Sequence, residues 1–272
     1  MHSRAFGKQS DTISEVGLGT WQLGGTEWGN VSDEQALGVL QAAYDAGTTF
    51  FDTADIYGGG RSETLIGQFL KRLGAARSSI RIASKLGRRF DAPNGWPGNL
   101  TLDAMRRHTQ ESLQRLGIEQ LFLQQFHCIP FEVLKQGEVF ENMRTLQREG
   151  LIRYWGVSVE TVEEALYCLQ QEGCAALQVI YNIFDQSPED DLFPLCRERN
   201  IAVIARVPFD EGTLTGTLTK KTTWPEGDWR NTYFVPENLS ASVDRAEALR
   251  PLLPAGMTMP ELALRWILEN PT

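Results

Sequence analysis

The sequence is poor in histidine and cysteine, and it has no long hydrophobic run. Its three histidines, at positions 2, 108 and 127, cannot assemble the two- or three-histidine site of a metallohydrolase, so no metal is expected. The four cysteines lie far apart without a C-x-x-C pair, which indicates reduced thiols in a cytoplasmic protein. No apolar stretch reaches the roughly 18 residues of a membrane span, and the N-terminus shows no secretory signal.

The overall charge and composition favour one acidic globular domain. The chain has 26 Lys and Arg against 35 Asp and Glu, a net charge of −9, which argues against a nucleic-acid partner. It is 42% hydrophobic and 22% charged, so it can bury a sizeable core. Its 272 residues fit one large α/β unit and show no repeat or linker. We therefore treat residues 1–272 as a single domain, with no prediction of its oligomeric state.

Short apolar segments alternate with amphipathic ones along nearly the whole chain. Strands separated by helices pair in parallel and are buried on both faces, which explains continuous apolar runs. This repeating order predicts an α/β fold of the (β/α)₈ TIM-barrel type. The expected strands are 16–23, 48–52, 80–84, 121–127, 152–157, 176–181 and 201–206. The expected helices are 32–47 and one capped by Ser62, then 102–116, 140–148, 162–169, 190–199, 239–250 and 260–269.

The strand count is one short of a complete barrel. The sequence stops at Thr272, where an eighth strand is expected, so we expect the eighth strand and last helix to be missing through truncation or an unobserved tail. Two short strand-like pieces, 4–6 and 12–15, predict an N-terminal β-hairpin that plugs the barrel floor. The long segment 213–236 predicts a loop that serves a site.

Four polar residues follow the ends of predicted strands. Asp52 ends the second strand, Lys85 follows the third, His127 ends the fourth, and Tyr57 lies on the loop after Asp52. Each has an ordinary structural interpretation when taken singly, as a turn former, a solvated lysine, a buried histidine or a packed ring. The active site of a barrel lies at the carboxyl ends of its strands, so the four side chains are expected to converge.

These residue types suit the reduction of a carbonyl group. A tyrosine titrates near ~10 and is a weak proton donor at neutral pH, but a lysine ammonium beside it lowers the pKa of the phenol. A carboxylate paired with the lysine keeps it charged and in place. A histidine can donate a hydrogen bond that orients the carbonyl oxygen. Hydride would arrive on carbon and a proton on oxygen.

The chain resembles the aldo-keto reductases over nearly its whole length. Several motifs in the family's order and spacing carry the resemblance, and together they are far more specific than any one alone. They are Gly17-Leu18-Gly19-Thr20-Trp21, Phe51-Asp52-Thr53-Ala54-Asp55-Ile56-Tyr57-Gly58, Arg61-Ser62-Glu63, Ala83-Ser84-Lys85-Leu86-Gly87, Gln125-Phe126-His127-Cys128, Gly150-Leu151-Ile152-Arg153-Tyr154-Trp155-Gly156-Val157-Ser158 and Leu214-Thr215-Gly216.

The resemblance implies a catalytic tetrad, a cofactor and a substrate class. It identifies Asp52, Tyr57, Lys85 and His127 as catalytic, with Tyr57 as proton donor, and it implies NADPH and a small-molecule carbonyl substrate. Trp21, Tyr57 and His127 would line the substrate pocket. Ser158 and Gln178 would hold the nicotinamide carboxamide. The full set expected to contact the cofactor is Gly19, Thr20, Trp21, Ser158, Gln178, Arg206, Pro208, Gly212 and Leu214.

The chain departs from the family pattern at three places. Val159 stands where many members have asparagine, and Arg206 stands where many stack a tyrosine on the nicotinamide; a guanidinium can also stack on a planar ring. The segment that grips the adenosine 2′-phosphate in the family is absent, so NADPH over NADH rests on the family alone.

Other interpretations stay open beside the reductase. One is an NADPH-binding sensor or regulatory subunit with little turnover, against which the intact tetrad argues. Another is a barrel inactive for want of its eighth strand. The loop residues Trp96, Trp224 and Trp229 either build an aromatic substrate pocket or pack at the surface.

Overall fold

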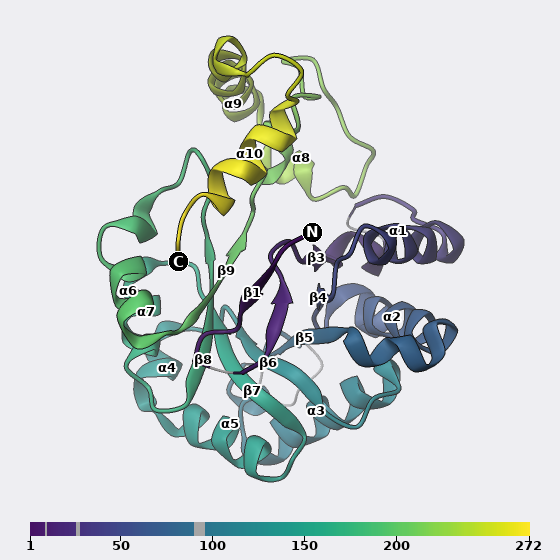
Figure 1. Ribbon diagram of the computed structural model, residues 1–272, viewed down its shortest axis with the longest axis vertical. Helices are drawn as coiled ribbons and strands as arrows, with labels where there is room; N and C mark the ends of the chain where they lie inside the picture. Colours follow the sequence, from purple (N-terminus) through teal and green to yellow (C-terminus); the bar gives the residue numbers. More distant parts are fainter. Residues whose placement is uncertain (9, 26–27, 90–95) are drawn as a thin grey trace.

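A curved sheet of seven parallel strands forms the centre of the protein. The computed structural model describes residues 1–8, 10–25, 28–89 and 96–272. Within them the strands are hydrogen-bonded in the order β3-β4-β5-β6-β7-β8-β9, so neighbours in the chain are neighbours in the sheet (Figure 1). The strands are β3 (Leu18–Gly19), β4 (Phe50–Asp52), β5 (Arg81–Leu86), β6 (Leu121–His127), β7 (Ile152–Ser158), β8 (Cys174–Ile180) and β9 (Ala202–Arg206).

Helices cover the outside of the sheet in an arc, which is the arrangement of a (β/α)₈ barrel (Figure 1). The predicted fold class is confirmed, with seven parallel strands in the part of the chain that the structure describes and with β3 and β9 at the two edges. Between β6 and β7, where one helix over 140–148 is predicted, the chain forms two, α4 (Phe131–Gln136) and α5 (Glu138–Arg148). The helices are α1 (Asp33–Asp45), α2 (Arg61–Leu73), α3 (Leu102–Leu116), α4 (Phe131–Gln136), α5 (Glu138–Arg148), α6 (Val162–Leu169), α7 (Leu192–Arg199), α8 (Arg230–Tyr233), α9 (Pro236–Leu249) and α10 (Met259–Leu268).

Local sequence signals account for many of these boundaries. Ser32 caps α1 in a reciprocal capping box with Gln35, as its residue type and position predict. The expected cap of α2 is wrong: Gly60 is the N-cap, and the buried Ser62 hydroxyl donates to the carbonyl oxygen of Thr20 (3.0 Å). The expected strand 16–23 is also too long, because the 3₁₀ turn η1 (Trp21–Gly24) follows β3. Tertiary contacts override the local signal at both places.

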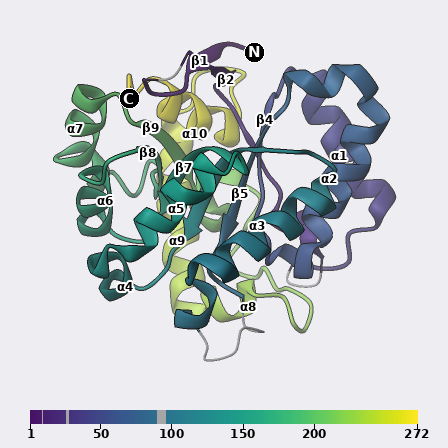
Figure 2. The ribbon, with the colours of Figure 1, turned by 90° about the horizontal axis from the view of Figure 1, so that it is seen from below.

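The N-terminal hairpin closes the floor of the sheet. Strands β1 (Ser3–Ala5) and β2 (Thr12–Ser14) pair antiparallel and lie across the end of the molecule opposite α8 (Figure 2). Phe6 follows β1 and is 0% exposed. Its ring centroid lies 4.9 Å from that of Phe122 and 5.5 Å from that of Tyr154. The predicted plug is therefore present, and a single aromatic side chain anchors it.

The segment after β9 crosses the opposite end of the sheet. It contains the 3₁₀ turn η6 (Asp210–Thr215) and α8, then leads through α9 into α10. The guanidinium of Arg4 ties the end of this segment to the hairpin, because it donates to the carbonyl oxygens of Leu268 (2.5 Å) and Asn270 (3.2 Å). Among the described residues, no helix combines the length and apolar character needed to cross a membrane.

The packing of Phe6 predicts the effect of removing its ring. Phe6→Ala should lower the free energy of unfolding by about 3–5 kcal/mol, because it leaves a cavity beneath the sheet. Urea unfolding followed by far-UV circular dichroism measures this. Leu252→Ala, at a side chain that is 69% exposed, is the control and should change stability by less than about 0.5 kcal/mol. An equal effect of the two substitutions would contradict the anchoring role.

Candidate active site

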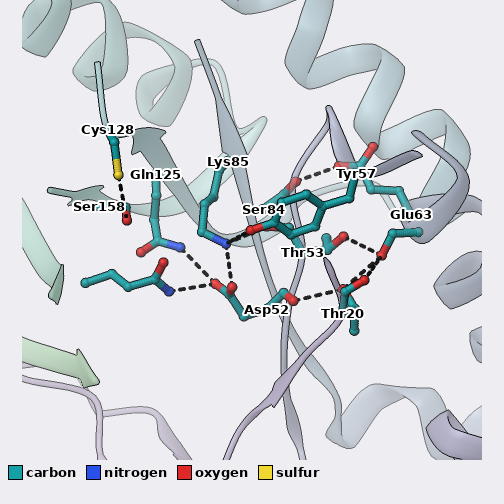
Figure 3. A network of polar contacts seen from close by, with 12 residues as sticks. Thr20, Asp52, Thr53, Tyr57, Glu63, Ser84, Lys85, Gln125, Cys128 and Ser158 are labelled. Atoms are coloured by element: carbon teal, nitrogen blue, oxygen red, sulfur yellow. Dashed lines mark hydrogen bonds and ion pairs between the residues drawn. The ribbon is translucent and has the colours of Figure 1, made fainter. Parts of the chain in front are cut away.

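A buried ion pair lies at the carboxyl ends of β4 and β5. The side chain of Lys85 is 2% exposed, and its ammonium group pairs with the Asp52 carboxylate and donates to the carbonyl oxygen of Thr53 (2.9 Å). The second oxygen of Asp52 accepts hydrogen bonds from the amides of Gln125 (3.1 Å) and Gln178 (3.0 Å). Figure 3 shows Lys85 and Gln125 both turned toward Asp52. Three further strands, β5, β6 and β8, thus position the carboxylate of β4.

The other two predicted catalytic side chains lie against this pair. Tyr57 begins the 3₁₀ turn η2 (Tyr57–Gly60), and its hydroxyl oxygen is 3.4 Å from the Lys85 nitrogen. The ring of His127 stands edge-on to the Tyr57 ring, with centroids 5.6 Å apart. The structure therefore brings Asp52, Tyr57, Lys85 and His127 together at one mouth, as the strand-end rule leads us to expect.

Close backbone packing places the Tyr57 loop. Gly58 has a φ of 60°, in the left-handed region, and a Cβ there would lie 1.9 Å from the carbonyl oxygen of Gly24. Only glycine fits this contact, because any side chain would push η2 away from η1. The glycine that follows Tyr57 therefore sets how closely the phenol approaches Lys85.

Burial changes the proton affinities of both members of the Tyr57–Lys85 contact. Burial raises the pKa of Tyr57 above its usual value, although the Lys85 charge and hydrogen bond act to lower it. Lys85 acts on this pKa in the expected direction, but removal of water outweighs it, so the net shift is upward. Burial acts to lower the pKa of Lys85, but Asp52 and Tyr57 outweigh it, so that pKa is raised and Lys85 stays charged.

His127 is held in its neutral form. Burial, together with the positive charges of Lys85, Arg88 and Arg206, depresses the pKa of His127 well below 6.5. Its Nδ1 atom is buried and has no hydrogen-bond partner in the described part of the chain. A neutral imidazole beside a phenol can donate one hydrogen bond to an oxygen placed between them.

A cavity of about 1150 Å³ opens beside Asp52 and Tyr57 and continues between the sheet edges β3 and β9 toward the hairpin. Most residues expected to contact the cofactor line it. They are Gly19, Thr20, Trp21, Gln178, Arg206, Pro208 and Gly212.

Three of the expected cofactor residues have their side chains engaged elsewhere. The Thr20 hydroxyl donates to the carbonyl oxygen of Asp52 (2.9 Å) and is buried. The Leu214 side chain packs with Met259 in a separate apolar cluster, and its backbone N–H donates to the carbonyl oxygen of Phe209 (2.9 Å). Ser158 is 1% exposed, and its hydroxyl lies 3.5 Å from the Cys128 sulfur.

The segment after β9 has features that fit a dinucleotide. Gly212 has a φ of 102°, and a Cβ built on it meets nothing within 4 Å, so the space beside its Cα is open, although its N–H donates to the carbonyl oxygen of Phe209 (3.0 Å). Val207, Asp210 and Glu211 also take positive φ values (57°, 47° and 54°). Such strained backbone is concentrated at ligand-binding sites. The Nε atom of Arg206 is buried without a hydrogen-bond partner among the described residues, while its Nη2 donates to the carbonyl oxygen of Val159 (3.2 Å).

Tryptophan side chains form one wall of the mouth. The Trp21 ring stacks on Tyr57 at 6.1 Å, and Trp28 stands edge-on to Trp21 at 5.2 Å. Trp229, from the long loop, contacts both indoles at 5.4 and 5.2 Å. Of the other loop tryptophans, Trp224 stacks on Phe234 instead, and the side chain of Trp96 lies outside the described residues.

Gln125 has no role of its own among the predictions from the sequence, although it stands in one of the family motifs, and Trp28 is not named among them. Gln125 stands two residues before His127 on β6, and side chains two apart on a strand point to the same face, so this spacing could have identified it. Trp28 has no such signal, because only its contact with Trp21 and Trp229 places it at the site.

Comparisons with known proteins agree with this geometry. Residues 15–272 match the Aldo/keto reductase family. The NADH-specific methylglyoxal reductase of Escherichia coli (strain K12) is 31% identical over 280 residues, covering 97% of this chain and 85% of the relative. Aldo-keto reductase yakc [NADP(+)] of Schizosaccharomyces pombe (strain 972 / ATCC 24843) is 30% identical over 271 residues, covering 96% of this chain and 78% of the relative.

Solved structures show the same similarity. The glycerol dehydrogenase AKR11B4 from Gluconobacter oxydans superposes with a TM-score of 0.82 at 27% identity, covering 98% of this chain and 83% of that one. The holo form of the aldo-keto reductase AKR11C1 from Bacillus halodurans gives a TM-score of 0.79 at 28% identity, with 99% and 83% covered.

The depressed pKa of His127 predicts a pH dependence of stability. Below pH 6.5 the unfolded chain binds a proton at this residue and the folded chain does not, so stability is lost as pH falls. The wild type should lose about 1.4 kcal/mol per pH unit relative to His127→Gln between about pH 6.5 and the folded pKa. Urea unfolding of both proteins at pH 7.5, 6.0 and 5.0 measures it; a constant difference would show that His127 titrates normally.

Proposed function

Because this chain belongs to the aldo-keto reductase family, we propose that it reduces aldehydes or ketones to alcohols with NADPH. The family consists of oxidoreductases that act on carbonyl compounds with nicotinamide cofactors. The observation that carries the proposal is the buried ion pair of Lys85 and Asp52. The Lys85 nitrogen lies 3.4 Å from the Tyr57 hydroxyl oxygen, and the neutral His127 ring stands beside the Tyr57 ring.

The cofactor would lie over the carboxyl ends of the strands, against the segment after β9. Gln178 lines the cavity there and would meet the nicotinamide carboxamide, while its own amide donates to Asp52 (3.0 Å). The guanidinium of Arg206 offers a flat cation for stacking on the nicotinamide. The open space beside the Gly212 Cα would leave room for a pyrophosphate to approach closely. The bound nicotinamide supplies the hydride.

The proton comes from Tyr57 in this proposal. A carbonyl oxygen placed between Tyr57 and His127 accepts a hydrogen bond from each, which polarises the C=O bond. Burial keeps Tyr57 protonated until negative charge develops on that oxygen. When the phenol gives up its proton, the Lys85 ammonium stabilises the phenolate, and Asp52 keeps the ammonium charged and in place. Lys85 therefore stabilises the phenolate that proton transfer produces, while Tyr57 stays neutral before the reaction.

The wall of Trp21 and Trp28 favours substrates with an apolar or flat part beside the carbonyl group. Relatives named for methylglyoxal and glycerol act on small polar compounds, so substrate size is a variable for the assay. A panel should contain both short polar aldehydes and aromatic ones.

The role of Tyr57 predicts the result of removing its hydroxyl. Tyr57→Phe should lower kcat by about 10²–10⁴-fold, because the developing alkoxide loses its proton donor, and leave the cofactor Kd unchanged. NADPH oxidation at 340 nm across the aldehyde panel measures turnover. Undiminished turnover in Tyr57→Phe would reject the tyrosine as acid. A wild type that binds NADPH and reduces nothing would favour the alternative of a cofactor sensor.

The stacking role of Arg206 predicts a loss of affinity for both cofactors. Arg206→Met should raise the Kd of NADPH and of NADH by about 10-fold each, because the nicotinamide is common to the two. Quenching of tryptophan fluorescence gives the Kd values, and we expect the wild type to bind NADPH more tightly than NADH. Arg250→Met, at an exposed pair with Glu247, is the matched control. Unchanged affinities in Arg206→Met would remove this residue from the cofactor site.

A further inference from the structure

A second buried carboxylate, outside the four residues of the proposed mechanism, lies between two of the catalytic loops. Asp55 stands two residues before Tyr57, on the loop between β4 and η2. Its backbone N–H donates to the carbonyl oxygen of Lys85 (3.1 Å). Its carboxylate oxygen Oδ2 accepts a hydrogen bond from Nε of Arg89 (3.1 Å), four residues after Lys85. The loop that carries Tyr57 is therefore tied to the backbone of Lys85 and to the side chain of Arg89.

The tie extends to the outer helices. Nη1 of Arg89 also pairs with Glu111 of α3 (2.6 Å), and the backbone oxygen of Arg89 accepts a hydrogen bond from the buried Asn99 side chain. Thus Arg89 is held by Glu111 of α3 and by Asn99, ten residues further along the chain, while it holds Asp55. On its opposite side, the Tyr57 loop packs directly on the backbone of Gly24. Asp55 and Gly24 bracket the turn that presents the phenol.

The Asp55 carboxylate is shielded from water, because its side chain is 0% exposed. Its Oδ1 atom has no hydrogen-bond partner among the described residues. The charged groups around it come from three elements. They are Arg89 on the loop after β5, Glu63 on α2, and Arg115 on α3, which is itself paired with Glu63 (2.7 Å). Burial, opposed by Arg89 and reinforced by Glu63, raises the pKa of Asp55 to about 7.

We propose that Asp55 is a positioning residue for the reduction: when ionised, its bridge to Arg89 holds the Tyr57 loop against Lys85, and protonation of Asp55 releases that hold. The inference rests on the proposed function, because it acts through the Tyr57 proton donor. The contact at risk is the 3.4 Å between the Tyr57 hydroxyl and Lys85, which is already at the long end of a hydrogen bond. A small displacement of the phenol there affects the rate strongly.

The test compares wild type and Asp55→Asn across pH. Asn keeps the shape of the side chain and imitates the protonated acid. The ratio of kcat, wild type over variant, should be near 1 at about pH 5.5 and rise to about 10-fold above about pH 8, with its midpoint near 7. Tyr57 itself does not titrate in this range, because its pKa lies above its usual value of 10.0. The cofactor Kd should not change.

Thermal unfolding separates positioning from a general structural role. The folded protein disfavours the Asp55 charge, so stability that is fully present below the ordinary pKa of 3.8 is lost as pH rises from there to about 7. Asp55→Asn should therefore raise Tm above pH 7, by roughly 10 °C, while it lowers kcat. A merely structural role would lower both. Asp103→Asn, at a side chain that is 93% exposed on α3, is the matched control and should change neither.

A second variant approaches the same bridge from its other end. Arg89→Gln should reproduce the pH-dependent loss of kcat, and Arg89→Lys should restore part of it above pH 7, because it keeps the charge. These variants decide the matter if Asp55→Asn does not fold. A pH-independent ratio in a folded variant overturns the inference, as does a loss of kcat that parallels a loss of Tm.

Tyr57→Phe in the same assay keeps the two proposals apart. If Tyr57→Phe loses activity and the ratio for Asp55→Asn is flat, the proposed function stands and the positioning role of Asp55 is rejected. If Tyr57→Phe is as active as wild type, the proposed function fails and the role of Asp55 fails with it.

Discussion

The Lys85 ammonium group is charged in a place that water barely reaches, and the arrangement around it follows from that constraint. A buried cation without a partner is very costly, so Asp52 must lie beside it. The carboxylate in turn needs donors for its second oxygen, which Gln125 and Gln178 supply. These side chains come from β4, β5, β6 and β8, and the curved parallel sheet brings the carboxyl ends of these strands together. The architecture and the ion pair depend on each other.

The exclusion of water also determines the proton states around the pair. It raises the pKa of Tyr57 and depresses that of His127, so both rings are neutral beside a charged lysine. A neutral donor pair next to a fixed positive charge suits an oxygen that becomes negative only during the reaction. The charge of Asp55, one loop away, is disfavoured by the same burial. The group that changes its charge near neutral pH is therefore Asp55, which does not touch the reacting atoms.

Much of the fold and of the candidate site could be predicted, because the signals involved are local. Residues 121–127 form a strand and residues 102–116 form a helix, both at the predicted bounds. In the structure, Thr101 is the N-cap of that helix. The rule that active sites lie at the carboxyl ends of barrel strands correctly predicted that Asp52, Lys85 and His127 lie close together. Predictions were wrong where a distant partner decided the outcome. Ser62 reads as a helix cap, but its hydroxyl bonds to Thr20, a residue in another part of the chain.

The sequence by itself determined the order of strands and helices, the types of charged side chain at the strand ends and the family, since these depend on spacing along the chain. Only the tertiary structure decided how strongly each group is buried, and hence that the pKa of Tyr57 rises although Lys85 lies beside it. It also decided the contact between Trp28 and Trp229 and the bridge between Asp55 and Arg89. Burial and long-range contacts are properties of the packed molecule, and no local pattern encodes them.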